Sequence, residues 1–247
     1  MDIVLREDEK IEDLQCKGLR IIQNKKWFCF GMDAVLLTNY CDIKNNSKIA
    51  DLGTGTGIIP ILLSGKRDYS KAYAIEIQEE VAEMARRSVE LNNLQDKIEI
   101  LNIDLKETLD YLEPNSFDAV ISNPPYKLTN SGIVNPTDKK AISRHEIKCT
   151  LEDVISTAAA LLKQYGRFYM VHRPDRLADI MYLLRKYKLE PKQIRFVHSR
   201  AAAKPNMILI RASKNGNPEL KFDPPLYIYD DKGDYTDDVY EIYEMEK

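Results

Sequence analysis

Short apolar runs alternate along the chain with segments whose apolar residues have helical spacing. The runs have the length and β-branched content of buried strands, and they cover residues 48–52, 72–77, 98–102, 117–122 and 167–172. The clearest helix is expected over residues 79–93, where the apolar residues fall on one face. Alternation of strand and helix predicts a mostly parallel, doubly wound sheet.

Further helices are expected after an Asp33 N-cap, from Ile58, over 151–163 and over 175–187, with Gly166 ending the third of these. The last two runs, 193–198 and 207–212, have no long helix between them, which favours an antiparallel pair. The predicted fold class is α/β, with a doubly wound, seven-stranded, mostly parallel sheet and an antiparallel C-terminal hairpin. One domain is expected over 1–247, with an N-terminal extension (1–45), a core (46–212) and a C-terminal extension (213–247).

The composition is typical of a globular protein, with 44% apolar and 30% charged residues in 247. No apolar run approaches the roughly 18 residues needed to span a bilayer, and the acidic N-terminus lacks a signal-peptide pattern. We therefore expect a cytoplasmic protein without a membrane partner. The four cysteines form no C-x-x-C pair, which favours reduced thiols and no metal site. The sequence leaves the oligomeric state uncertain.

The net charge of −3 is unevenly distributed. Residues 1–13 carry a net −4 and residues 230–247 a net −6, which leaves +7 for residues 14–229. Seven of the basic residues fall within residues 185–204, against a single acid. A basic body is compatible with phosphate contacts and a nucleic-acid partner, but a solvated helix face explains the same charges.

A glycine-rich loop, Asp51-x-Gly53-x-Gly55-x-Gly57, follows the first core strand and precedes a helix. Glycines allow a tight turn and the close approach of a ligand. The spacing differs from the G-x-G-x-x-G of dinucleotide folds, and no Gly-Lys-Ser/Thr follows as in a P-loop. Because the Asp51 carboxylate suits a cationic amino group better than a phosphate, the expected ligand is amino-acid-like, such as S-adenosylmethionine.

Polar side chains follow three more predicted strands. Glu76 ends the second strand and could accept the two hydroxyls of a ribose. Asp104 follows the third strand and could accept from an adenine amino group, and Asn123 follows the fourth. Because ligands bind beyond the carboxyl ends of strands in such sheets, we expect these side chains to face one site. A helix cap or a surface charge explains each acid taken singly.

The fourth strand runs directly into Asn123-Pro124-Pro125-Tyr126. An amide, two rigid prolines and an aromatic ring are suited to holding a planar molecule that carries an amino group. Taken alone, the tetrapeptide is equally well explained as a turn with a loop aromatic. A methyl donor facing it from the glycine loop favours the binding interpretation.

Together, these motifs resemble those of class I S-adenosylmethionine-dependent methyltransferases, with a Rossmann-like fold, that act on amino groups. Further segments resemble the bacterial tRNA(Val) adenine(37)-N6-methyltransferase family, namely Phe28–Leu37, Ala141–Glu146, Val171–Leu177 and Val197–Pro205. Met32 and residues 201–204 depart from the family's pattern, which affects the choice of RNA more than the reaction.

The resemblance implies methylation of an adenine in tRNA, beside the anticodon of a valine tRNA. The cofactor-binding residues that it implies are Gly31, Asp33, Asp51, Gly53, Thr54, Gly55, Gly57, Glu76, Ile77, Asp104, Leu105 and Asn123. Catalysis is expected from Asn123, Pro124, Pro125 and Tyr126: two oxygens accept the N–H groups of the amine, and the ring stacks on the base. The basic residues expected to contact tRNA phosphates are Lys139, Lys140, Arg144 and His145.

Two alternatives remain open at this stage. A protein-glutamine N5-methyltransferase would present the same planar NH₂ group to the tetrapeptide, although such enzymes usually carry an N-terminal helical domain longer than the 45 residues here. A non-catalytic RNA-binding protein with a vestigial methyltransferase fold is the other, and the intact glycine loop and tetrapeptide argue against it.

Overall fold

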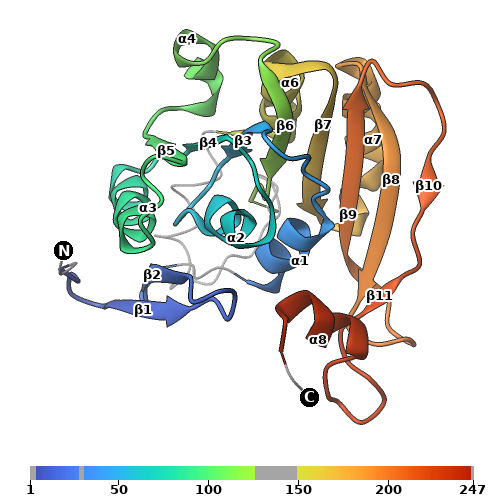
Figure 1. Ribbon diagram of the computed structural model, residues 1–247. Helices are drawn as coiled ribbons and strands as arrows, with labels where there is room; N and C mark the ends of the chain where they lie inside the picture. Colours follow the sequence, from blue (N-terminus) through green and yellow to red (C-terminus); the bar gives the residue numbers. More distant parts are fainter. Residues whose placement is uncertain (1–3, 28–30, 126–148, 246–247) are drawn as a thin grey trace, which may run out of the picture.

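A nine-stranded mixed sheet runs through the molecule and carries helices on both faces (Figure 1). The computed structural model describes residues 4–27, 31–125 and 149–245. Its strand order is β10-β8-β9-β7-β6-β3-β4-β5, with β11 also paired to β8. Strands β6, β3, β4 and β5 are parallel neighbours, whereas β9 is antiparallel to both β7 and β8. The predicted α/β class, with an antiparallel C-terminal part, is confirmed.

The strands are β1 (Glu9–Asp13), β2 (Arg20–Asn24), β3 (Lys48–Leu52), β4 (Lys71–Ile75), β5 (Ile98–Leu101), β6 (Phe117–Ser122), β7 (Leu162–His172), β8 (Leu189–His198), β9 (Pro205–Lys214), β10 (Lys221–Phe222) and β11 (Leu226–Tyr227). The helices are α1 (Met32–Tyr40), α2 (Ile58–Lys66), α3 (Glu79–Leu91), α4 (Thr108–Tyr111), α6 (Leu151–Leu161), α7 (Leu177–Lys186) and α8 (Asp237–Tyr243), with single 3-10 turns η1 (Leu105–Glu107) and η2 (Pro174–Arg176).

The carboxyl ends of the four parallel strands lie side by side. Leu52 of β3 pairs with Ser122 of β6 and with Ile75 of β4, and Ile75 pairs with Leu101 of β5. Each strand therefore ends at the same edge of the sheet. The residues that directly follow these strands consequently lie along one edge of the sheet.

Strand β7 departs from the sequence-based expectation. The predicted helix ends two residues early, at Leu161, and Gly166 lies inside β7 rather than ending that helix. A bulge shifts the pairing of β7 with β6 between Leu162 and Arg167. A Cβ on Gly166 would lie 2.9 Å from the backbone oxygen of Lys163, so this tight bulge requires glycine. Two short strands not predicted, β10 and β11, extend the sheet beyond the expected seven strands.

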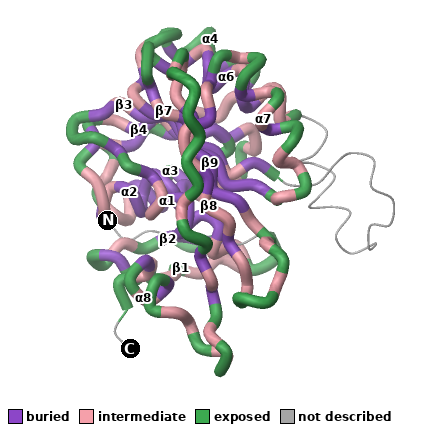
Figure 2. Tube along the Cα trace, turned by 90° about the vertical axis from the view of Figure 1, so that its right-hand side faces the viewer, coloured by how far each residue is buried: buried purple, intermediate pink, exposed green. Residues whose placement is uncertain are grey.

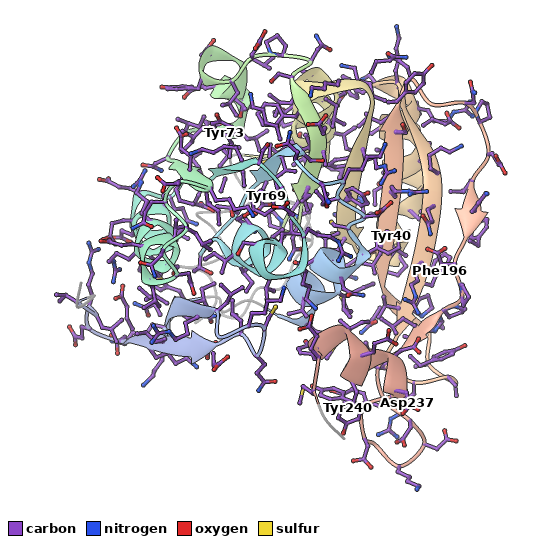
Figure 3. The ribbon with its side chains drawn as sticks, in the orientation of Figure 1. Tyr40, Tyr69, Tyr73, Phe196, Asp237 and Tyr240 are labelled. Atoms are coloured by element: carbon purple, nitrogen blue, oxygen red, sulfur yellow. The ribbon has the colours of Figure 1, made fainter. Side chains whose placement is uncertain are left out.

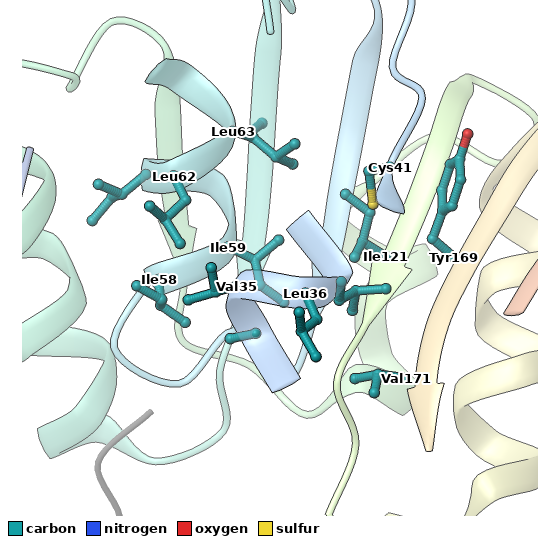
Figure 4. Close-up of a cluster of buried hydrophobic side chains, with 14 of the residues drawn as sticks. Val35, Leu36, Cys41, Ile58, Ile59, Leu62, Leu63, Ile121, Tyr169 and Val171 are labelled. Carbon is teal, nitrogen blue, oxygen red and sulfur yellow. The ribbon is translucent and has the colours of Figure 1, made fainter. Parts of the chain in front are cut away.

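Two hydrophobic clusters fill the space between the sheet and its helices. One joins the sheet to α1, α2, α3 and α8, and the other joins it to α6 and α7. Figure 2 shows the sheet strands largely buried between exposed outer turns. In Figure 4, Leu36 of α1 and Ile59 of α2 meet Ile121 of β6 in the first cluster. This packing joins α1 and α2 to one face of the sheet.

Both ends of the chain pack against this core. The β1–β2 hairpin lies against α3, and α8 contacts α1 and β11. Figure 3 shows Asp237 and Tyr240 on α8, below the β8–β9 pair. In the part of the chain that the structure describes, no helix has the length and apolar character to cross a membrane.

Candidate active site

The glycine loop between β3 and α2 has an open concave backbone. Gly53, Gly55 and Gly57 all have positive φ, at 76°, 59° and 84°, a conformation that glycine adopts without a steric penalty. A Cβ on Gly53 or Gly55 would meet no atom within 4 Å. The backbone N–H groups of Gly53 and Thr54 donate to the Ile75 carbonyl, at 3.0 and 2.9 Å. The loop is therefore pinned to β4 and open on its other side, where a ligand can approach closely.

Asp51 is the most unusual polar group beside this loop. The residue is 1% exposed, and neither carboxylate oxygen has a hydrogen-bond partner within the described residues; the same holds for the hydroxyl of Thr54. Burial raises the pKa of Asp51 to about 7. A weak interaction with the Thr54 hydroxyl, outside hydrogen-bond geometry, lowers this pKa, and the Glu76 carboxylate raises it. An unpartnered buried carboxylate is costly. A cationic group of a ligand, such as the ammonium of an amino acid, would remove that cost.

Glu76 is also buried, at 5% exposure, but it is well satisfied. One carboxylate oxygen accepts from the backbone N–H of Gly55 at 3.0 Å, and the other from Gln78 N–H at 2.9 Å. The side chain of Asn102 donates to the Glu76 carbonyl at 2.8 Å. The Gln78 side-chain amide also donates to the second carboxylate oxygen, at 3.3 Å. A carboxylate has about four acceptor positions, so Glu76 is fixed, and it accepts two ribose hydroxyls only if one of these three bonds to the carboxylate is given up. The adjacent Ile77 is half-buried at the same edge.

Asp104 and Leu105 follow β5 and open the turn η1. The Asp104 side chain accepts from Lys106 N–H at 3.0 Å and so acts as a cap. Leu105 is buried, at 8% exposure, and packs in the second hydrophobic cluster. Capping occupies part of the Asp104 carboxylate, and the remaining acceptor positions suit the predicted contact to an adenine amino group.

Asn123 and Pro124 follow β6 at the same edge. The hydroxyl of Ser122 donates to the Leu52 carbonyl at 2.8 Å, which ties the end of β6 to the end of β3. Pro124 is buried and Pro125 exposed. The tetrapeptide therefore begins directly beside the strand end that carries Asp51. This neighbourhood favours the binding interpretation over a simple turn.

Asp33 reaches Asn123 from a distant part of the chain. The side-chain N–H of Asn123 donates to Asp33 Oδ2 at 3.0 Å, and the backbone N–H of Ala34 donates to Asp33 Oδ1 at 2.9 Å. The expectation that Asp33 caps the helix is wrong, because α1 begins at Met32 and Gly31 is its N-cap. Asp33 instead lies inside the first turn of α1, and its side chain contacts Asn123.

Five of the predicted residues lie outside the described part of the chain. They are Tyr126, Lys139, Lys140, Arg144 and His145, and their roles stay predictions.

The basic segment 185–204 does not form one patch. Lys188 and Lys192 lie at the amino end of β8 or just before it, and Lys192 donates to the Asn217 carbonyl at 3.0 Å. Arg200 and Lys204 follow the other end of the ten-residue strand, about 30 Å away at 3.3 Å per residue. Only this second group is near the carboxyl edge of the parallel strands.

Sequence reasoning missed Gln23 of β2. The residue is 1% exposed, and neither its amide oxygen nor its amide nitrogen has a partner among the described residues. Nearby on β2, the backbone N–H of Ile22 donates to Ser88 of α3 at 3.0 Å. A glutamine directly after two isoleucines, at the end of a short apolar run not assigned to a predicted strand, is the signal that could have identified it.

Comparison with known proteins agrees with this geometry. The family of the methyltransferase small domain matches residues 32–187, more than half of the chain, and the chain belongs to this family. The matched region begins at α1 and includes Asp33, the glycine loop and Asn123. The fold and the site thus define a class I methyltransferase whose methyl donor is S-adenosylmethionine.

Individual relatives extend the similarity beyond the matched region. A tRNA1(Val) (adenine(37)-N6)-methyltransferase of Pedobacter heparinus is 28% identical, over 83% of this chain and 85% of the relative. An enzyme of the same name from Flavobacterium johnsoniae is 25% identical, over 92% and 96% of the two chains. The crystal structure of a predicted O-methyltransferase, Atu636 of Agrobacterium tumefaciens, has a TM-score of 0.70 and 26% identity, over 86% of this chain and 96% of that chain.

Proposed function

We propose that the protein transfers a methyl group from S-adenosylmethionine to the N6 atom of adenine 37, beside the anticodon of a valine tRNA. One observation carries the proposal: Asn123 and Pro124 emerge from β6 beside the strand end that presents the unpartnered carboxylate of Asp51. A site for a planar amine thus adjoins a site for a cationic amino acid. The names of the similar enzymes support the RNA and the position.

Each polar residue of the site is assigned to a different part of the cofactor. Bound S-adenosylmethionine supplies an electrophilic methyl group on a sulfonium. Asp51 binds the ammonium of its methionine part, Glu76 accepts from the ribose hydroxyls, and Asp104 accepts from the adenine amino group. The open glycine loop allows the close approach that these contacts need. The Ile77 position, together with Thr54 and Leu105, is proposed to line the same pocket, whereas Gly31 and Asp33 are assigned to Asn123 rather than to the cofactor.

The target amine is a weak nucleophile because its lone pair is delocalised into the adenine ring. The Asn123 side-chain oxygen and the Pro124 carbonyl each accept one of its N–H groups. This arrangement turns the nitrogen toward tetrahedral geometry, with its lone pair directed at the methyl group. Proline fixes φ and removes a competing N–H donor, so the carbonyl direction is rigid. Orientation of this kind contributes up to roughly 7–11 kcal/mol in well-placed reactions.

The proposed RNA partner requires phosphate contacts and a stacking residue. We assign the first role to Lys139, Lys140, Arg144 and His145, and the second to Tyr126. Binding to tRNA, a substrate found in the cytoplasm, should then weaken steeply with salt because counterions are released. An affinity that is independent of salt would contradict this part of the proposal.

The proposal is tested by methylation of transcripts with radiolabelled S-adenosylmethionine. A valine tRNA transcript with adenine at position 37 should be methylated, and nucleoside mass spectrometry should identify the product as N6-methyladenosine. The matched control is the same transcript with guanosine at position 37, which should remain unmodified. Methylation of a glutamine peptide but of neither transcript would instead establish the protein-glutamine enzyme.

A further inference from the structure

The amide of Asn123 can take two orientations that differ only in exchanging oxygen and nitrogen. Only one orientation presents the oxygen to the target amine, and a rotated amide would present an N–H donor to another donor. The reaction therefore needs a neighbouring group that distinguishes the two orientations. In the described part of the motif, Pro124 and Pro125 have no N–H and provide no such group.

Asp33 is that neighbour. Its Oδ2 atom accepts from the Asn123 side-chain N–H at 3.0 Å, across 90 positions of sequence. Rotating the amide would place its oxygen against a carboxylate oxygen at the same distance, which is repulsive. The amide oxygen consequently lies on the branch that faces away from Asp33. Charge-assisted hydrogen bonds of this kind are roughly twice as strong as neutral ones.

The carboxylate of Asp33 is itself held in place. The residue is 9% exposed in the first turn of α1, and its Oδ1 atom accepts from Ala34 N–H at 2.9 Å. Gly31 leaves room for it, because a Cβ there would lie 2.9 Å from Oδ1. Gly31 has φ of −105°, which any residue adopts. Space for the Asp33 carboxylate, and not backbone conformation, is therefore the structural reason for glycine at this position.

We propose that Asp33 is a positioning residue, which fixes the Asn123 amide with its oxygen toward the target amine. The inference rests on the proposed function, since it assigns a role within the same site. It predicts that loss of the Asp33 side chain lowers kcat without weakening the binding of S-adenosylmethionine. It also predicts that Gly31→Ala acts only through Asp33.

The first test compares Asp33→Ala with Asp33→Asn. The alanine variant should lose kcat by on the order of 10²-fold, with the Kd for S-adenosylmethionine changed less than threefold in calorimetry. The isosteric asparagine variant keeps one acceptor and should lose less. Asp42→Asn is the matched control, because Asp42 follows the other end of α1 and pairs with Arg167 at 2.6 Å. Its kcat should equal that of the wild type.

The second test reverses the hydrogen bond. Asn123→Asp alone places two carboxylates together and should be nearly inactive. Adding Asp33→Asn restores a donor opposite an acceptor, and the double variant should regain at least tenfold in kcat over Asn123→Asp. A purely structural role for Asp33 predicts no such rescue, and its absence would overturn the inference.

The third test uses the space beside Asp33. Gly31→Ala should lower kcat in the wild-type background and have no further effect in the Asp33→Ala background. Equal effects in both backgrounds would contradict the inference. An inactive wild-type protein on every adenine transcript would instead refute the proposed function, so the two failures are distinguishable.

Discussion

Two regions of this protein bury polar groups in opposite ways. In the glycine-loop region, residues 51–57, the Asp51 oxygens and the Thr54 hydroxyl have no partner among the described residues, and two glycines face open space. In the hairpin interface, where residues 9–24 meet α2 and α3, Arg87 holds Glu9 through two bonds of 2.7 and 2.6 Å. There a Cβ on Gly65 would lie 2.8 Å from Cys16 Sγ.

The difference indicates that the glycine-loop region is a ligand site and that the hairpin interface serves the stability of the fold. Buried polar groups are normally hydrogen-bonded, and Glu9 and Arg87 in the hairpin interface follow that rule, with Gln23 as an exception. Unpaired groups beside open space indicate a missing partner, and we propose that this partner is the methyl donor. Changes in the first region should therefore affect binding and catalysis while sparing the fold, and changes in the second should do the reverse.

The largest effect is expected from Asn123→Ala. Removing the amide oxygen leaves the target amine unoriented, so kcat should fall by about 10²- to 10³-fold. Binding of S-adenosylmethionine in calorimetry and the melting temperature should stay near those of the wild type. Near-normal turnover in single-turnover methylation assays would refute the assignment of the tetrapeptide as the reaction centre.

Asp51→Asn should separate binding from stability. Loss of the negative charge should raise the Kd for S-adenosylmethionine by on the order of 10- to 100-fold, as expected for the loss of a charged hydrogen bond. An unchanged Kd in titration calorimetry would show that the carboxylate does not meet the ammonium.

The same residue predicts a pH dependence of the ligand-free protein. Because burial raises the pKa of Asp51 to about 7, the folded state binds this proton more tightly than the unfolded state does. Stability should consequently fall as pH rises from about 4 through about 7, by at most about 4 kcal/mol from this group. Urea unfolding at pH 5 and pH 8 measures the change, and Asp51→Asn should flatten it. If the stability of Asp51→Asn depends on pH as strongly as that of the wild type, another titratable group is responsible for the pH dependence.

Arg87→Ala tests the other region. It leaves the Glu9 carboxylate, whose side chain is 3% exposed, without its charged partner and with the Arg6 backbone N–H as its remaining donor among the described residues. The free energy of unfolding should fall by about 2–3 kcal/mol. The kcat of the folded enzyme should not change. Arg86→Ala is the matched control, since Arg86 makes a 3.5 Å bond to the Ile100 carbonyl and should cost much less in chemical denaturation.

Gln23 tests the comparison between the two regions, because its amide on β2 of the hairpin has no partner among the described residues. Gln23→Met replaces a buried, unsatisfied amide by an apolar chain of similar size. The ligand-free protein should gain about 1 kcal/mol of stability, measured by urea unfolding. A loss of stability would instead show that the Gln23 amide contributes to the stability of the hairpin interface.

Local sequence signals were sufficient for most of the fold. Apolar runs and glycine punctuation predicted the parallel strands and the carboxyl edge because strand burial and turn geometry depend on nearby residues. The end of the helix at Leu161 and the bulge around Gly166 could not be read from the sequence, since pairing with β6 decides both. Strands β10 and β11 were missed because two-residue strands form only against an existing edge.

The sequence by itself determined the fold class and predicted which residues carry the chemistry. The glycine loop, the acids after each strand and the Asn-Pro-Pro-Tyr motif have the residue types that a methyl donor and an amine require. Only the tertiary structure decided which of those groups are satisfied. The contact between Asp33 and Asn123, the unpartnered state of Asp51 and the buried amide of Gln23 depend on segments distant in sequence. Hydrogen bonding and desolvation act through space, and no local pattern records them.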